Sequence, residues 1–160
     1  MKVVVLQGSP RRKGNTETVT DWALTGLNET APDADVVVVR VADKQVSGCI
    51  EDFACQAVPD APGCPIEDDM GELYALLIAA DLIVIATPVF CWGVTAQLKC
   101  VLDRLYATIK FNEMPPRSLL AGKKMALIVT SGGPAEDGAN LIEAMFDRLV
   151  GISRSTDLGR

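Results

Sequence analysis

The sequence has 160 residues, of which 49% are hydrophobic, and its formal net charge at neutral pH is −6. This length is enough for one domain with a packed core, and the apolar content excludes a disordered chain. Eight acids and no lysine or arginine lie between Lys44 and Lys99. Such a surface is poor for nucleic acid or anionic lipid, so we expect neither nucleic acid nor a membrane as a partner.

The N terminus and the cysteines indicate where the protein is located, and the lack of histidine limits its chemistry. No leader-like segment precedes the strand pattern that starts at Lys2, and Asp81 interrupts the longest apolar stretch, residues 73–90. Five cysteines without a secretion signal predict reduced thiols and a cytoplasmic location. Without histidine, the commonest general base and metal ligand are both missing.

The first third of the chain alternates between strand and helix patterns. The β-branched runs KVVVL (2–6) and DVVVVRV (35–41) predict strands buried on both faces, as in a parallel sheet. Residues 16–27 between them carry apolar side chains at helical spacing, with Asn15 or Thr16 as the N-cap.

The alternation continues after an irregular segment, residues 43–68, which is rich in cysteine and acids and long enough to suggest a functional loop. We expect a helix over 70–80, capped by Asp68 or Asp69, then a strand over 81–87 and a helix over 94–110. A loop over 111–122 leads to a strand over 123–130, and a loop over 131–138 leads to a helix over 139–151. Residues 151–160 are too polar to settle whether a fifth strand is present. This order predicts one α/β domain over 1–160, with a doubly wound parallel sheet in three layers, α/β/α.

The loop GSPRRKGNT, residues 8–16, lies between the first strand and the first helix, where a phosphate site is expected. Five residues separate Gly8 from Gly14 and Asn15 stands where a Walker lysine would be, so this is no nucleoside triphosphate loop. The dinucleotide pattern lacks its middle glycine. Short side chains that donate hydrogen bonds at the start of a helix suit a single phosphate monoester. An ordinary turn with exposed cations would explain the same residues.

Two further loops leave predicted strands at the same edge of the sheet. TPVFCWG, residues 87–93, places Phe90 and Trp92 there, and large rings beside a phosphate site suit a planar ligand such as a flavin. The alternative is that both rings pack against a neighbouring helix or subunit. SGGP, residues 131–134, adds a loop whose backbone can approach a ligand closely.

Together, GSPRRKGNT, DDMGELY, TPVFCWGVTAQLKCVLDR and TSGG resemble the NADPH-dependent FMN reductase family of flavodoxin-like proteins, over most of the chain. The resemblance implies a flavodoxin-like fold and bound FMN. It assigns the phosphate to Ser9, Arg11, Asn15 and Thr16, the flanks of the ring and ribityl chain to Pro88, Val89, Phe90, Trp92 and Gly93, and the other side of the ring to Ser131, Gly132 and Gly133.

The function that follows is an oxidoreductase that takes electrons from NADPH or NADH through FMN to a flavin, quinone or other small acceptor. No histidine is needed, because the cofactor performs the difficult step. Such families often form dimers or tetramers, so we expect a homodimer or homotetramer. One alternative is an FMN electron carrier that serves a protein partner, and the acidic segment between Lys44 and Lys99 would suit a basic partner. The other is a protein that keeps the fold but has lost its cofactor.

One branch of this family, the iron–sulfur flavoproteins, carries a four-cysteine motif where this chain reads GCIEDFACQAVPDAPGC. Cys49, Cys55 and Cys64 resemble three of the four positions, and Asp52 stands at the second. A four-iron cluster normally uses four thiolates, so we expect no metal. Idle thiols in a lid, or a labile disulfide, remain open.

Overall fold

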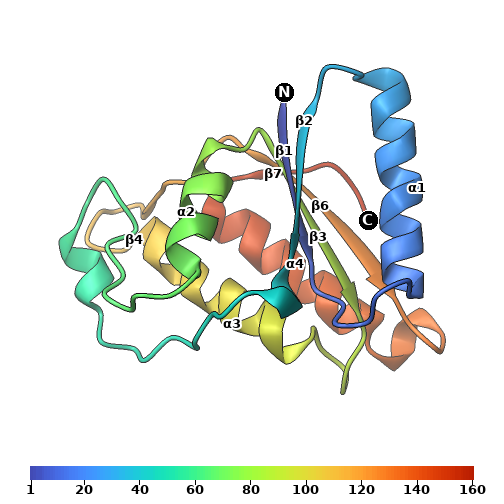
Figure 1. Cartoon of the computed structure of the whole chain (residues 1–160). Coiled ribbons are helices and arrows are strands. Elements are labelled where there is room, and N and C mark those ends of the chain that lie inside the picture. The colour runs from blue at the N-terminus through green and yellow to red at the C-terminus, as the bar shows by residue number, and fades with distance from the viewer.

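A computed structural model describes all residues from 1 to 160 (Figure 1). The helices are α1 (Asn15–Thr30), α2 (Met70–Ala79), α3 (Ala96–Arg104) and α4 (Ala139–Ser153). The strands are β1 (Lys2–Gln7), β2 (Asp35–Arg40), β3 (Leu82–Pro88), β4 (Ile109–Lys110), β5 (Arg117–Ser118), β6 (Lys124–Thr130) and β7 (Thr156–Asp157). The expected α/β alternation is therefore confirmed.

The main sheet has five parallel strands in the order β2-β1-β3-β6-β7. The fifth strand exists but is only two residues long, and it pairs with the start of β6. The prediction that 35–41 is buried on both faces is wrong, because β2 lies at the sheet edge and leaves Val36 and Val38 39% and 47% exposed. A β-branched run fits an edge strand as well as a central one.

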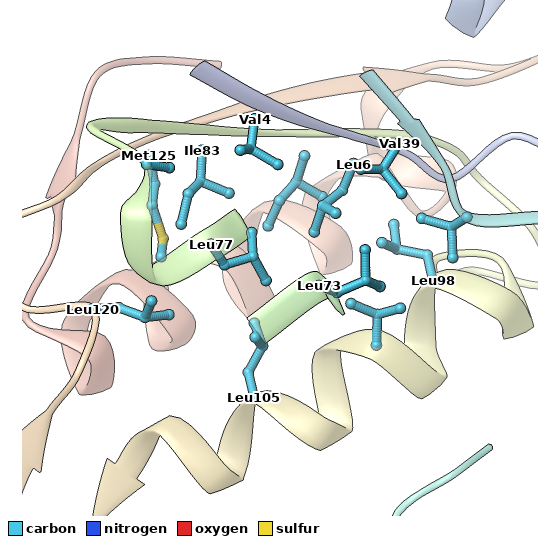
Figure 2. Close-up of a cluster of buried hydrophobic side chains, with 14 of the residues drawn as sticks. Val4, Leu6, Val39, Leu73, Leu77, Ile83, Leu98, Leu105, Leu120 and Met125 are labelled. Carbon is cyan, nitrogen blue, oxygen red and sulfur yellow. The ribbon is translucent and has the colours of Figure 1, made fainter. Parts of the chain in front are cut away.

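Helices cover both faces of the sheet, but unequally (Figure 1). The larger core packs α2, α3 and α4 against one face, through side chains such as Leu77 and Leu98 (Figure 2). Phe146 of α4 belongs to the same core. On the opposite face α1 packs alone, against a small cluster of Val3, Val5 and Leu82. None of the helices combines the length and the apolar character that crossing a bilayer requires.

Two predicted boundaries need correction. The expected helix over 94–110 ends at Arg104, because a 3₁₀ turn follows and residues 109–110 form β4, which pairs antiparallel with β5 inside the expected loop 111–122. The expected N-cap of α1, Asn15 or Thr16, is also wrong. Gly14 is the N-cap, and no side chain caps this helix.

Candidate functional site

The loops after β1, β3 and β6 meet in one pocket of about 310 Å³ at the C-terminal edge of the sheet. It is lined by Ser9, Arg11, Gly14, Asn15, Thr16, Pro88, Val89, Phe90, Thr130, Ser131 and Gly132. Nine of the twelve residues assigned from the sequence are therefore brought together. The other three lie nearby: Trp92 and Gly93 line an adjoining groove, and the carbonyl of Gly133 accepts a hydrogen bond from the Ser131 hydroxyl at 2.7 Å.

Gly8 fixes how the first loop leaves β1. Its N–H donates to the carbonyl of Ala86 at 2.7 Å, and its own carbonyl accepts from the hydroxyl of Thr95 at 2.7 Å. A Cβ atom at this position would lie 2.7 Å from Leu98 Cδ2 and 3.0 Å from the Ala86 oxygen. Only glycine fits here, because the backbone is held in contact with both neighbours.

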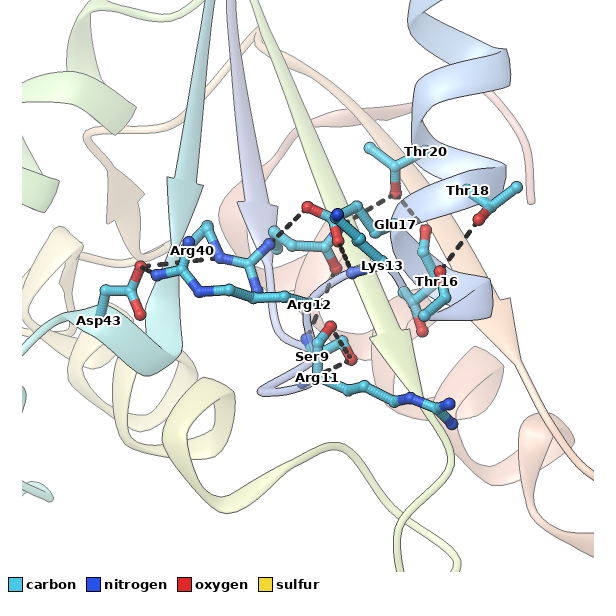
Figure 3. A network of polar contacts seen from close by, with 12 residues as sticks. Ser9, Arg11, Arg12, Lys13, Thr16, Glu17, Thr18, Thr20, Arg40 and Asp43 are labelled. Atoms are coloured by element: carbon cyan, nitrogen blue, oxygen red, sulfur yellow. Dashed lines mark hydrogen bonds and ion pairs between the residues drawn. The ribbon is translucent and has the colours of Figure 1, made fainter.

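Local hydrogen bonds fold the phosphate-type loop (Figure 3). Ser9 is buried, and its Oγ accepts from the N–H of Arg11 at 3.3 Å and donates to the Arg11 carbonyl at 3.4 Å. Lys13 adopts a left-handed backbone with φ 56°, and its N–H donates to the carboxylate of Glu17. The turn is therefore held by its own side chains before any ligand binds.

Thr16 joins the first helix to the far side of the pocket. Its Oγ1 lies 2.7 Å from Oγ1 of Thr130, the last residue of β6. Sequence reasoning missed Thr130, because only the register that places it opposite Pro88 brings it to the pocket. One of the two hydroxyls donates its hydrogen to the other, so the hydrogen of the accepting hydroxyl is free to donate to a ligand.

Some of the cations in and beside this loop are paired with carboxylates, whereas Arg11 is not. Arg12 pairs with Asp43 at 2.7 Å, and Arg40 pairs with Glu17 at 2.7 Å. Arg11 forms no salt bridge, lines the pocket, and points away from the paired network (Figure 3). An unpaired guanidinium beside an uncapped helix N terminus favours an anionic ligand.

A strained turn after β3 borders the pocket through Phe90. Phe90 and Gly93 exchange hydrogen bonds of 2.8 and 2.9 Å, and the two residues between them, Cys91 and Trp92, have left-handed φ values of 46° and 61°. Non-glycine residues adopt this conformation uncommonly, and those that do cluster at functional sites. The turn leaves Phe90 49% and Trp92 67% exposed, so both rings are available to a ligand or a partner.

A second cavity, of about 360 Å³, lies under the cysteine-rich loop. Its lining includes Cys49, Asp52, Cys55 and Cys64, together with Arg104 at the end of α3 and Tyr106 in the 3₁₀ turn that follows. No three cysteine or acidic side chains converge closely enough to hold a single metal ion. No disulfide links the cysteines.

Two buried cations hold this loop in place. The guanidinium of Arg104, 1% exposed, pairs with Asp68 at 3.0 Å and donates to the carbonyls of Ser47 and Ile66 at 3.1 and 3.4 Å. Lys110 is fully buried, and its Nζ donates to the carbonyls of Cys55, Pro62 and Ala107. Both ends of the loop are therefore attached to the last residue of α3, and its middle is attached to β4.

Asp68 also starts α2. Its carboxylate accepts from the N–H groups of Met70 at 3.0 Å and Ser47 at 2.8 Å, whereas the Asp69 carboxylate accepts from Gln45. Burial acts to raise the pKa of Asp68, but these hydrogen bonds and Arg104 outweigh it, and the pKa lies below its ordinary value. Of the two predicted caps, Asp68 makes the capping bond although Asp69 holds the N-cap position.

Comparison with known proteins gives consistent matches. The family model for NADPH-dependent FMN reductase matches residues 1–159. An iron–sulfur flavoprotein of Methanocaldococcus jannaschii is 36% identical over 141 residues, which are 88% of this chain and 66% of that protein. An FMN-dependent NADH:quinone oxidoreductase of Leptothrix cholodnii is 32% identical over 173 residues, with 99% of this chain and 82% of that protein covered.

Solved structures agree on the fold. An NAD(P)H:quinone oxidoreductase from Methanothermobacter marburgensis superposes with a TM-score of 0.73 at 19% identity, covering 99% of this chain and 86% of that one. The chain spans between 51% and 66% of the length of the iron–sulfur flavoproteins that it matches.

Proposed function

Because this chain belongs to the NADPH-dependent FMN reductase family, we propose that it binds FMN in the pocket at the C-terminal edge of the sheet. The activity proposed is an NADPH- or NADH-dependent oxidoreductase that serves a flavin, quinone or other small acceptor. The observation that carries this proposal is the pocket itself, where an unpaired Arg11 and an uncapped helix N terminus lie beside exposed aromatic rings.

The residues present fit FMN. Arg11, the Ser9 and Thr16 hydroxyls and the first-turn N–H groups would hold the terminal phosphate, since charge-assisted hydrogen bonds are the strong ones. Phe90 would pack against the ring, and the Ser131–Gly132 backbone would approach it from the β6 side. FMN, when bound, supplies the chemistry of accepting hydride from a nicotinamide and passing electrons on. The chain's own task is to bind, orient and shield.

The exposed rings also support a homodimer or homotetramer, in which a second copy covers part of the crevice. Trp92 would be a contact residue in that assembly, because large aromatic side chains dominate protein interfaces. Sedimentation analysis of the wild type and of W92S tests the assembly, and a monomer in both cases would contradict it.

Five free cysteines support a cytoplasmic location.

An anaerobic absorbance spectrum, followed by addition of NADPH, tests the proposed function. We expect a two-band flavin spectrum that bleaches rapidly with NADPH or NADH. A flavin spectrum that persists with both nicotinamides would instead indicate an electron carrier. A protein that cannot be loaded with FMN would overturn the assignment.

Substitutions at the phosphate end give a sharper prediction. Arg11→Ala and Thr16→Val should each weaken FMN binding by about 1–3 kcal/mol, as expected for hydrogen bonds to a charged group. Fluorescence titration measures the affinity for FMN and for riboflavin, which lacks the phosphate. Riboflavin affinity should not change.

Arg12→Ala is the matched control. Arg12 is a neighbouring cation that pairs with Asp43 and does not line the pocket. It should leave both affinities unchanged. Equal losses of FMN and riboflavin binding in the Arg11 variant would show that the phosphate lies elsewhere.

The cavity under the cysteine loop favours a second function, binding of an iron–sulfur cluster. The sequence alone led us to expect no metal, but all four motif positions line this one cavity. Three of the four positions offer thiolates, the ligands that iron–sulfur clusters prefer, and Asp52 offers a carboxylate at the fourth. Cys49, Cys55 and Cys64 would hold it, and it would supply one-electron transfer.

A further inference from the structure

We propose that Asp52 makes this cluster site chemically unequal, so that three irons are bound by thiolates and the fourth, facing Asp52, is held by a carboxylate and is exchangeable. This inference rests on the second proposed function and concerns the residue in which this chain departs from a four-cysteine motif. Three observations on the loop carry it.

The first observation is the placement of the four side chains. Cys49, Asp52 and Cys55 follow one another at intervals of three residues, and together with Cys64 they line the same cavity of about 360 Å³. Asp52 forms no salt bridge, and its only hydrogen bond is to the N–H of Ala54 at 3.2 Å. One face of its carboxylate is therefore free to bind a metal.

The second observation is the way the loop presents sulfur. The N–H of Glu51 donates to Sγ of Cys49 at 3.4 Å, and the side-chain amide of Gln56 donates to Sγ of Cys55 at 3.6 Å. Hydrogen bonds to sulfur tune the properties of iron–sulfur clusters. The residues on either side of Asp52, Glu51 and Phe53, have left-handed φ values of 58° and 56°. Strain of this kind persists where the surrounding structure holds a functional geometry.

The third observation concerns an unsatisfied hydrogen-bond donor at the cavity. Arg104 lines the cavity, and its Nε is buried and has no hydrogen-bond partner, although the guanidinium pairs with Asp68. Glu51, Asp52 and Asp103 also line the cavity, so its charge does not by itself call for an anion. A buried N–H without a partner is costly, and an occupant that accepts a hydrogen bond, such as a cluster sulfur, would satisfy it.

The chemical consequence concerns one iron. A carboxylate is a hard ligand and binds cluster iron less firmly than a thiolate does. Ferricyanide would accept one electron from a [4Fe–4S]²⁺ cluster and become ferrocyanide. The cluster would release Fe²⁺ from the Asp52 position and become [3Fe–4S]⁺, so that charge and atoms balance. Ferrous iron with dithionite as electron donor would restore the original cluster.

The experiment compares the full chain with two cysteine-gaining variants, after anaerobic loading of each with FMN, ferrous iron and sulfide. Asp52→Cys completes the four-thiolate motif. Glu51→Cys is the matched control, because it adds the same thiol at the neighbouring acid, which also lines the cavity but is not a motif position. Electron paramagnetic resonance and iron and sulfide analysis follow treatment with one equivalent of ferricyanide.

We expect the wild type and E51C to give the three-iron signal, reversibly, and D52C to give roughly tenfold less of it. Equal signals in the wild type and D52C would overturn the role of Asp52. A cluster that forms in D52C but not in the wild type would overturn it as well. If neither chain holds iron although both bind FMN, the cluster function itself fails, whereas the flavin function stands.

Discussion

Replacing Arg104 with methionine should lower the free energy of unfolding by about 3–5 kcal/mol, as is typical when one partner of a buried ion pair is removed. The substitution leaves the buried carboxylate of Asp68 without its cation and the carbonyls of Ser47 and Ile66 without a donor. It also detaches both ends of the cysteine-rich loop from α3. Urea unfolding followed by circular dichroism measures the change.

The same helix offers the control. Lys99 forms an exposed salt bridge with Asp103, with side chains 54% and 46% exposed. Lys99→Met should therefore cost about 0–1 kcal/mol, because water screens the pair. A double variant, R104M with Asp68→Asn, should recover part of the loss by removing the unpaired charge. Equal effects of R104M and K99M would mean that the Arg104–Asp68 pair does not hold the loop.

Gly8→Ala is expected to destabilise the protein by about 1–3 kcal/mol and to weaken FMN binding, because the added methyl group overpacks a closed space. It would meet both the Leu98 side chain and the Ala86 carbonyl oxygen. The strand cannot move away, because Gly8 is hydrogen-bonded on both sides, to Ala86 and to Thr95. Any relief must shift the loop that carries Ser9 and Arg11.

Gly26→Ala is the opposite case with the same chemical change. Gly26 lies inside α1, and a Cβ atom there would have no neighbour within 4 Å. This variant should be more stable by about 0.5–1 kcal/mol, since alanine favours the helix. Unfolding curves and FMN titrations of both variants test the pair. A G8A protein as stable as G26A would show that the contact at Gly8 is easily relaxed.

The sequence predicted most of the fold because its local signals agree with its tertiary arrangement. Continuous β-branched runs gave the strands, and the alternation with helices gave the parallel sheet and hence the edge at which the loops meet. The position of a strand within a sheet has no such signal. The run 35–41 therefore looked buried, although it lies at an edge.

The end of α3 and the anchors of the cysteine loop could not be predicted for a different reason. Leu105 and Ile109 continue the apolar spacing of the helix, and only pairing with residues 117–118 shows that a strand starts at Ile109. Arg104 and Lys110 are residue types that usually lie at the surface. Most of the carbonyl groups that they meet lie 38 to 57 residues away in the sequence, so no local pattern reveals their burial.

Helix α3 has a consequence for electron flow. Its first turn follows the strained turn beside the flavin pocket, and its last residue, Arg104, lines the cavity of the cysteine loop. Nine helical residues span roughly 13 Å. An occupant of the pocket and an occupant of the cysteine-loop cavity would thus be held apart by a rigid spacer, and the length of this helix would set the distance for any electron that passed between them.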